Sequence, residues 1–342
     1  MATVGILANP LSGRDVRRLA ARASTTTLEH KRDQVARIAV GAVAAGAEKL
    51  LLLDEPFRVS SEAVRSLGLD AEIDLLDVGA SLTAADTVRA TEAMRDAGCA
   101  ALVVLGGDGT SRIVSTVWRD APLLPLSTGT NNVFPLALEA TAAGAAAGVV
   151  ATGAARLEEC SRRAKIVRVE TGATTELALI DAGLIADDHL GNLMPFDGEK
   201  IRRLVLTRAE PDSVGMSPIG GLLESCGRDD EAGVVVDLDP KADVDPLLVP
   251  LSPGLYRQLR VTQCRRVDLG EPIELSGPGL VELDGDRTLQ LEAEQTVTAR
   301  VEREGPRVID ASRALQLGSS AGAFRGRSEE FCAKAFHGAG CC

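Results

Sequence analysis

Continuous apolar runs, separated by helix-like segments, dominate residues 1–153 and limit the folds that this chain can adopt. The predicted strands are Val4–Ala8, Lys49–Leu53, Glu72–Asp77, Ala100–Leu105 and Leu123–Leu126. A run with no polar residue, such as Ala101–Leu105, is typical of a strand buried on both faces of a parallel sheet. Helical patterns lie between the strands, for example Asp33–Ala45 and Ala84–Ala97. We therefore predict an α/β domain with a doubly wound parallel sheet, which binds ligands outside the carboxyl ends of its strands.

The pattern changes at residue 154, after which short strand-like runs are separated by Gly, Pro and Asp. Such spacing predicts an antiparallel β-sandwich. Two of these runs, Val281–Leu283 and Thr288–Gln290, flank Asp284-Gly285 and are predicted to form a hairpin. Residues after Leu317 are small, polar and rich in glycine. We therefore assign residues 154–317 to a second domain and predict a disordered tail over 318–342.

Charge and composition exclude several classes of partner. The formal net charge is 37 − 49 = −12 and no basic block offsets it, so binding to nucleic acid or to anionic membranes is not expected. Seven cysteines without zinc-ligand spacing are typical of reduced thiols, and three histidines exclude a histidine-rich metal site. The run Asp187–His189 is interpreted as a solvated turn rather than a metal cluster. Without a basic leader, the chain is predicted to be cytoplasmic.

Residues Asn9–Gly13 directly follow the first predicted strand. Small residues there let backbone N–H groups approach an anion at the start of the next helix. Most arginines of that helix are expected to face solvent, and at most Arg14 reaches the cleft. The alternative is a tight turn in which Pro10 and Gly13 serve geometry only. Taken alone, this turn fits the alternative better.

Residues 106–110, Gly-Gly-Asp-Gly-Thr, follow the most apolar predicted strand, and we call them the glycine turn. Three glycines leave bare backbone against which a phosphate can lie, and Thr110 and Ser111 can cap the following helix. Asp108 stands where a carboxylate can accept the proton of an acceptor hydroxyl or hold Mg²⁺. A purely structural role of Asp108 in the turn is the alternative, but the surrounding glycines favour a functional one.

A third polar turn, Ser127–Pro135, follows the last of these strands. Its hydroxyl and amide groups can hydrogen-bond a nucleotide base, ribose or phosphate. Asn131 or Asn132 can also serve as the N-cap of the next helix, and the two roles are compatible.

These motifs resemble those of one enzyme superfamily. Asn-Pro-x-Ser-Gly, Gly-Gly-Asp-Gly-Thr and Gly-Thr-Asn-Asn, with the late Asp284-Gly285-Asp286, are similar to motifs of NAD kinases, diacylglycerol kinases and sphingosine kinases. Within that superfamily the chain resembles the ATP-NAD kinase-like proteins of the acetoin-catabolism protein X family. The resemblance lies in Ala8–Leu19, Ser127–Pro135 and Met216–Leu223, and it extends over both domains.

The resemblance implies a kinase that uses ATP and Mg²⁺ in a cleft between a nucleotide-binding domain and a second domain that binds the acceptor and forms homo-oligomers. It implies that Asp108 is the catalytic acid of the glycine turn and that Asp284 is a rival candidate for the base. Metal ligands are not identified. The residues implied to bind the nucleotide are Asn9, Ser12, Gly13, Gly106, Gly107, Gly109, Thr110, Thr128, Gly129, Thr130 and Asn131.

The acceptor stays open at this point. The resemblance implies the adenosine ribose 2′-hydroxyl of NAD, which would give NADP. Leu179–Gly183 lacks the Asn-Glu pair with which NAD kinases grip that acceptor, and Ser213–Gly221 differs from their Thr-Pro-Thr-Gly-Ser-Thr-Ala-Tyr loop. An acetoin-related or small-polyol kinase is the alternative within enzymes, and a non-catalytic nucleotide-binding regulator is the alternative of another class. A lipid kinase is disfavoured because the acidic, aromatic-poor chain offers no membrane device. A Rossmann oxidoreductase is disfavoured because Asn9–Gly13 replaces the Gly-x-Gly-x-x-Gly turn.

Overall fold

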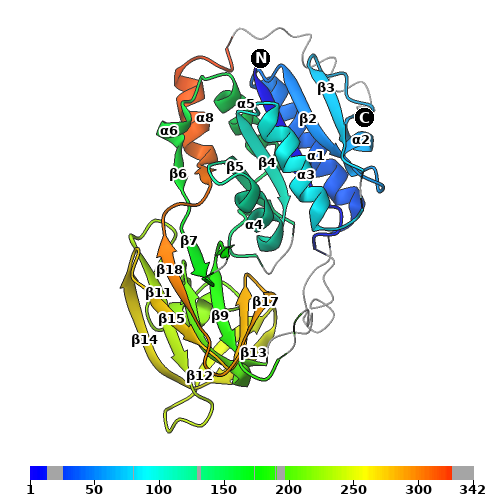
Figure 1. Cartoon of the computed structure of the whole chain (residues 1–342). Coiled ribbons are helices and arrows are strands. Elements are labelled where there is room, and N and C mark those ends of the chain that lie inside the picture. The colour runs from blue at the N-terminus through cyan, green and yellow to red at the C-terminus, as the bar shows by residue number, and fades with distance from the viewer. Residues whose placement is uncertain are drawn as a thin grey trace.

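The computed structural model describes residues 1–13, 26–79, 81–128, 132–172, 174–188, 190 and 197–325. These residues form an α/β domain and an antiparallel β domain that lie end to end (Figure 1). Six residues named above lie outside the described ranges: Arg14, Leu19, Gly129, Thr130, Asn131 and His189. Within those ranges, no helix combines the length and the apolar character needed to cross a membrane.

The first domain is built on a seven-stranded sheet with the order β3-β2-β1-β4-β5-β19-β6. The strands are β1 (Thr3–Ala8), β2 (Lys49–Asp54), β3 (Glu72–Asp77), β4 (Ala101–Gly106), β5 (Pro122–Ser127), β6 (Ser161–Arg163) and β19 (Arg307–Ile309). All neighbouring strands are parallel except β19 and β6, which confirms the predicted parallel sheet. Strands β2 and β3 lie on one side of β1, whereas β4 and β5 lie on the other side. The strand order therefore reverses between β1 and β4. Ligands of α/β sheets bind at such a reversal of strand order.

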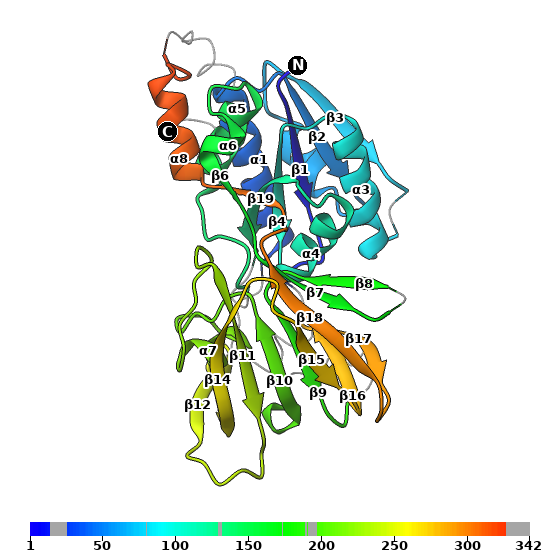
Figure 2. The same cartoon turned by 60° about the vertical axis from the view of Figure 1, so that its left-hand side comes forward.

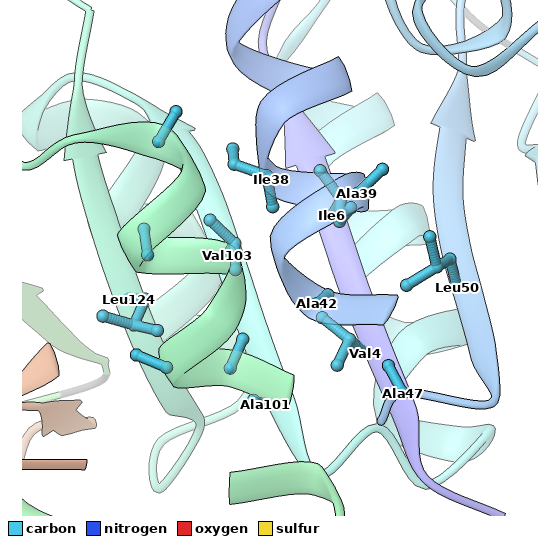
Figure 3. Packing of buried hydrophobic residues seen from close by; sticks show 14 of the residues in the cluster. Val4, Ile6, Ile38, Ala39, Ala42, Ala47, Leu50, Ala101, Val103 and Leu124 are labelled. Carbon is cyan, nitrogen blue, oxygen red and sulfur yellow. The ribbon is translucent and has the colours of Figure 1, made fainter. Parts of the chain in front are cut away.

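Helices cover both faces of this sheet. One face carries α1 (Leu28–Ala44), α2 (Val59–Val64) and α5 (Ala140–Ala151), and the other carries α3 (Ala84–Asp96) and α4 (Asp108–Val117). Figure 3 shows Ile38 of α1 in the cluster formed with Ile6 and Val103 of the sheet. The α1 and α5 backbones touch, because a Cβ atom on Gly144 would lie 2.1 Å from the carbonyl oxygen of Ile38. The small residues that dominate this sequence thus allow a thin, closely packed layer.

The C-terminal part of the chain returns to the first domain. Strand β19 pairs with β5, and α8 (Ala311–Ser320) packs against α5, while the short α6 (Leu157–Cys160) leads into β6. The sequence-based boundaries of 154 and 317 therefore differ from the structure, which joins these elements to the first sheet. The strands β6 and β19 have only three residues each, too few to form a recognisable apolar run. Helix α8 extends past residue 317, and residues 326–342 of the predicted tail lie outside the described ranges.

The second domain contains two facing antiparallel sheets, as predicted, with the orders β14-β11-β10-β9-β16-β17 and β15-β18-β7-β8 (Figure 2). Val205 and Val281 of the first sheet share a core with Val167 and Val301 of the second. The predicted hairpin is the β16–β17 pair. The elements of this domain are β7 (Ile166–Glu170), β8 (Thr175–Ala178), β9 (Asp181–Ile185), η2 (Gly198–Lys200), β10 (Ile201–Leu206), α7 (Ser217–Gly221), β11 (Ala232–Leu238), β12 (Leu247–Ser252), β13 (Leu255–Leu259), β14 (Val261–Asp268), β15 (Ile273–Ser276), β16 (Gly279–Leu283), β17 (Asp286–Leu291) and β18 (Thr296–Glu302).

Candidate functional site

A cavity of about 670 Å³ lies where the two domains meet. The first domain lines it with the turns that follow β1 and β4 and with the start of α3, and the second domain lines it with β9, β12, β16 and the turn after β16. The turns after β1 and β4 stand at the reversal of strand order, so the cavity occupies the place where the sheet is expected to bind a ligand.

The glycine turn forms the start of α4. Gly106 ends β4, Gly107 is the N-cap, and Asp108 opens the helix. A Cβ atom on Gly107 would lie 2.9 Å from the Oδ1 atom of Asn132, whereas one on Gly109 would meet no atom within 4 Å. A side chain on Gly107 would therefore have to displace the end of the Asn132 side chain, whereas Gly109 leaves its backbone open at the cavity. The first N–H groups of a helix have no intrahelical acceptor and carry partial positive charge, so this end of α4 suits an anion.

The turn after β1 is tied to the glycine turn by side chains. The Asn9 amide donates to the Thr110 hydroxyl at 2.9 Å, and the Asn9 Oδ1 atom accepts the N–H groups of Leu11 at 2.9 Å and Ser12 at 3.3 Å. The Thr128 hydroxyl donates to the Ser12 hydroxyl at 2.9 Å. The structure thus brings together Asn9, Ser12, Thr110 and Thr128, all of which the sequence analysis expected to bind the same nucleotide. Because the N–H groups of Leu11 and Ser12 are used internally, this turn presents fewer bare donors than its sequence predicts.

Lys31 of α1 was not identified from the sequence, yet it shapes this turn. Its side chain is fully buried, and its Nζ atom donates to the carbonyl oxygens of Asn9 at 2.8 Å, Pro10 at 2.8 Å and Ser12 at 2.6 Å. These bonds hold the carbonyl groups toward α1 and away from the cavity. In the sequence this residue is a lysine in the first turn of a helix that begins after Thr27. A lysine there is ordinarily expected to face solvent, so the sequence did not indicate its burial.

Asp108 lies between the cavity and the chain that follows β5. Its carboxylate accepts the backbone N–H groups of Phe134 at 2.9 Å and Val133 at 3.2 Å, and it lines the cavity. Burial and the negative charge of Asp284 raise the pKa of Asp108 to about 7, although the two N–H groups and Arg208 act in the opposite direction. The side chain therefore has both the structural role and the position at the cavity that the sequence left as alternatives. A carboxyl group that titrates near neutrality can accept a proton at physiological pH.

Asp284 occupies the turn between β16 and β17 with a φ of 50°. Its buried carboxylate accepts the N–H groups of Leu179 at 2.8 Å, Ile180 at 2.8 Å and Asp181 at 3.2 Å, and the Arg112 Nε atom lies 3.8 Å away. Burial raises the pKa of Asp284 to about 6 against these favourable contacts. Since its oxygens already hold three backbone donors, Asp284 is better placed to fix the loop between β8 and β9 than to take a proton.

Asp181 and Glu282 extend the acidic group, and the sequence gave no direct role to either. Asp181 begins β9, and Glu282 lies in the otherwise apolar β16, where it is fully buried and accepts the N–H group of Gly285. Burial and the negative charges of Glu282, Asp284 and Asp108 raise the pKa of Asp181 well above its ordinary range. A glutamate inside an apolar strand was the signal that could have identified this pair.

Two arginines link the domains beside this group. Arg112 of α4 forms an ion pair with Asp286 of β17. Arg208, which follows β10, donates to the carbonyl oxygen of Val133 at 3.1 Å and lies 5.2 Å from the centre of the Phe134 ring. Both contacts hold the second domain against the segments that carry Asp108.

No set of three or more His, Cys, Asp or Glu side chains in the described part of the chain is arranged to hold a metal ion. The acidic group therefore lacks the geometry of a complete protein cage for a cation.

Comparison with known proteins identifies the family. Residues 4–154 match the model of the ATP-NAD kinase N-terminal domain, and residues 165–304 match the acetoin catabolism protein X C-terminal domain. Acetoin catabolism protein X of Cupriavidus necator is 33% identical over 327 residues, which cover 92% of this chain and 91% of the relative. A solved structure from Bacillus anthracis str. Sterne, provisionally described as a diacylglycerol kinase, aligns with a TM-score of 0.46 and 12% identity over 90% of this chain and 97% of that one. The two family models and the Cupriavidus relative confirm the resemblance noted in the sequence. Since the similarity to the Cupriavidus protein spans nearly the full length of both, this chain belongs to the acetoin catabolism protein X family.

Proposed function

We propose that this protein is a kinase that transfers the γ-phosphoryl group of ATP to a hydroxyl group of a small acceptor. The observation that carries the proposal is the position of Asp108, at the start of α4, beside a cavity at the reversal of strand order. The match of residues 4–154 to the ATP-NAD kinase N-terminal domain supports the same class of reaction.

The triphosphate would lie along the first-domain wall. The start of α4 offers backbone donors and partial positive charge, and Gly109 lets the phosphate oxygens approach the main chain. Asn9 and Thr110 hold the two turns at a fixed separation. Phosphoryl transfer asks a protein mainly for positioning and charge stabilisation, so a rigid wall of this kind suits the reaction.

Asp108 would act as the base for the acceptor. The acceptor oxygen attacks the γ-phosphorus atom, the bond from that atom to the ADP oxygen breaks, and the hydroxyl proton passes to the Asp108 carboxylate. A pKa of about 7 suits this step, because the carboxylate form is well populated at neutral pH and is still basic enough to accept the proton.

The chain's residues fit Mg²⁺ as a partner of the triphosphate. Mg²⁺ prefers oxygen ligands and is commonly held by one or two carboxylates together with substrate phosphates, which agrees with the lack of a complete cage among the described residues. Asp181 supports this fit, because its buried Oδ1 atom has no hydrogen-bond partner in the described ranges. Bound there, the ion would neutralise phosphate charge beside the acidic group.

The test compares the wild type with Asp108→Asn. Purified protein with Mg-ATP is incubated with NAD, NADH and small hydroxylated metabolites, and ADP formation and the phosphorylated product are measured. We expect turnover to fall at least 100-fold in the variant while ATP affinity changes little, since general base catalysis contributes about 10²–10⁴-fold. Tight ATP binding without transfer to any acceptor would instead identify a nucleotide-binding regulator. If Asp108→Asn kept the turnover of the wild type while Asp284→Asn lost it, Asp284 and not Asp108 would be the base.

A further inference from the structure

One peptide group joins a side chain of the second domain to the carboxylate of the proposed base. The Arg208 Nη1 atom donates to the carbonyl oxygen of Val133 at 3.1 Å. The N–H group of the same peptide, which belongs to Phe134, donates to the Oδ1 atom of Asp108 at 2.9 Å. The cation of Arg208 therefore lies at the oxygen end of one peptide dipole, and the carboxylate of Asp108 lies at its N–H end.

This arrangement strengthens both hydrogen bonds. Bonds with an ionised donor or acceptor are about twice as strong as neutral ones, and bonds in a chain polarise one another. The guanidinium draws electron density toward the Val133 oxygen, which makes the Phe134 N–H group a better donor to Asp108. If the peptide turned over, its carbonyl oxygen would face the carboxylate and repel it, so the contact with Arg208 also fixes the direction of the peptide.

The segment that carries Arg208 is held firmly in the second domain. The buried Ser217 hydroxyl donates to the carbonyl oxygen of Arg208 at 2.9 Å. Ala209 exchanges two backbone hydrogen bonds with Cys226, at 2.8 and 2.9 Å. Arg208 itself is only 8% exposed, and its guanidinium lies 5.2 Å from the centre of the Phe134 ring. The side chain thus reaches the peptide from a fixed backbone and has little freedom to leave it.

The charges around Asp108 give this contact its importance. Burial, and Asp284 in the turn after β16, raise the pKa of Asp108, while Asp181 of β9 is close enough for the two acids to repel each other. Arg112, one turn further along α4, already faces Asp284 at 3.8 Å. The positive charge of Arg208 acts against the two acids and favours the charged form of Asp108.

The bridge crosses the boundary between the domains. Arg208 follows β10 of the second domain, whereas Asp108 opens α4 and Val133 follows β5, both in the first domain. Separation of the domains would withdraw the guanidinium from the Val133 oxygen and free the peptide to rotate. The orientation of the Asp108 carboxylate therefore depends on contact between the domains.

On the basis of the phosphotransfer proposed above, we infer that Arg208 is a positioning residue, which aims the Asp108 carboxylate at the acceptor hydroxyl through the peptide between Val133 and Phe134. Arg208 is not among the described residues that line the cavity, so it acts on the base without touching the substrates. The base is complete only when the second domain is in contact with the first.

The test compares the wild type with Arg208→Gln and Arg208→Lys, using Mg-ATP and the acceptor that the wild type phosphorylates fastest. Glutamine removes the charge, whereas lysine keeps it on a compact ammonium group. In Arg208→Gln we expect the rise of kcat near pH 7 to move up by about one unit, which lowers kcat at pH 7 by about 5-fold or more. This loss should shrink toward pH 9. The KM for ATP should change by less than about 2-fold, and Arg208→Lys should lie between glutamine and the wild type.

The matched control is Arg202→Gln on β10. Arg202 also donates to a backbone carbonyl oxygen, that of Glu199 at 2.6 Å, but it is not among the described residues that line the cavity. This variant should keep the kcat and the pH profile of the wild type. If urea unfolding shows that Arg208→Gln does not fold, Arg208→Met takes its place with the same expectation. A folded variant at position 208 with the kcat and pH profile of the wild type, or equal losses in Arg202→Gln, overturns the inference.

A titration without turnover separates this inference from the proposed function. Carboxyl-carbon NMR of protein with isotope-labelled aspartate measures the titration midpoint of Asp108, with Asp108→Asn to assign the resonance. If no acceptor is phosphorylated but the midpoint rises by about one unit in Arg208→Gln, the kinase proposal fails and the coupling of Arg208 to Asp108 stands. If an acceptor is phosphorylated and neither kcat nor the midpoint changes, the kinase proposal stands and the positioning role fails. An unchanged midpoint without turnover counts against both.

Discussion

The side-chain amide of Asn9 donates to the hydroxyl of Thr110 at 2.9 Å, across 101 positions of sequence. The bond joins the turn after β1 to the first turn of α4, the two segments that stand on either side of the strand-order reversal. Since the same Asn9 side chain also caps the N–H groups of Leu11 and Ser12, one residue fixes the shape of one turn and its position relative to the other.

Replacement of this residue should therefore affect both stability and nucleotide binding. Asn9→Ala removes three hydrogen bonds, and we expect the free energy of unfolding to fall by about 1–3 kcal/mol. Mg-ATP affinity should fall about 10-fold, because 1.4 kcal/mol of lost preorganisation is a factor of ten. Urea unfolding and calorimetry measure the two effects. Thr110→Val removes only the bond between the turns and should give a smaller loss of stability; an unaltered ATP affinity in Asn9→Ala would contradict the role assigned to this turn.

Lys31 is expected to be among the most sensitive positions outside the cavity. Lys31→Met keeps the apolar length of the side chain but leaves the carbonyl groups of Asn9, Pro10 and Ser12 without this donor. The Asn9 carbonyl oxygen keeps the Ser12 hydroxyl as a donor at 2.8 Å. Since buried acceptors without partners cost about 1–3 kcal/mol each, we expect a loss of about 2–5 kcal/mol in the free energy of unfolding, mainly from Pro10 and Ser12. The matched control is Lys49→Met, whose solvent-screened pair with Glu72 should contribute much less to stability. Similar losses in the two variants would refute the structural role of Lys31.

The raised pKa of Asp108 predicts opposite pH trends for activity and stability. Turnover should rise as pH increases through about 7, because the deprotonated carboxylate is the proposed base. The native protein binds this proton more tightly than the unfolded chain, whose aspartates titrate near about 4. The stabilisation that comes from binding this proton is therefore complete below about pH 4, and it is lost as the pH rises through the native pKa of about 7.

Asp108→Asn separates these trends. Relative to the wild type, the variant should gain on the order of 1 kcal/mol in stability between pH 5 and pH 8, while its residual turnover loses the rise near pH 7. Chemical unfolding and initial rates across this range provide the readouts. A wild-type rate that is independent of pH between 6 and 8 would argue against Asp108 as the base.

The contact of Arg112 with Asp286 and Asp284 should couple the domains measurably. Arg112→Gln leaves the fully buried Asp284 carboxylate without its neighbouring cation, and we expect a loss of about 2–4 kcal/mol in the free energy of unfolding together with a higher pKa of Asp284. Arg119→Gln is the control, since its exposed pair with Glu304 at 3.7 Å should contribute less than about 1 kcal/mol. If calorimetry gave the same free energy of unfolding for Arg112→Gln and the wild type, the association of the two domains would not depend on this contact.

The sequence identified the features that are local. The apolar run Ala101–Leu105 predicted a buried strand, and the glycine turn after it predicted the open backbone at Gly109, because both depend on neighbouring residues only. The polar residues Asn9, Ser12 and Thr128 also met as expected, since they follow strands whose carboxyl ends share one edge of the sheet.

What the sequence missed depends on contacts between distant segments. Lys31 in a helix is indistinguishable from a solvated lysine until the turn after β1 is placed over it. The three-residue β19 has no apolar period of its own and becomes a strand only because β5 offers an open edge. Asp284 resembled a catalytic acid, but the donors that fill its carboxylate come from residues 179–181, more than 100 positions earlier.

The return of β19 to the first sheet makes the sandwich an insertion with both attachment points side by side. Arg163 and Arg307 are direct partners in the β6–β19 pairing, and the segment that matches the family-specific C-terminal model, 165–304, lies between them. The two ends of this module emerge from adjacent positions of one ladder, so it is attached to the first domain through a single paired stem. Two covalent connections in place of one also restrict twisting between the modules, so any opening of the cleft has to proceed as a hinge about this paired stem.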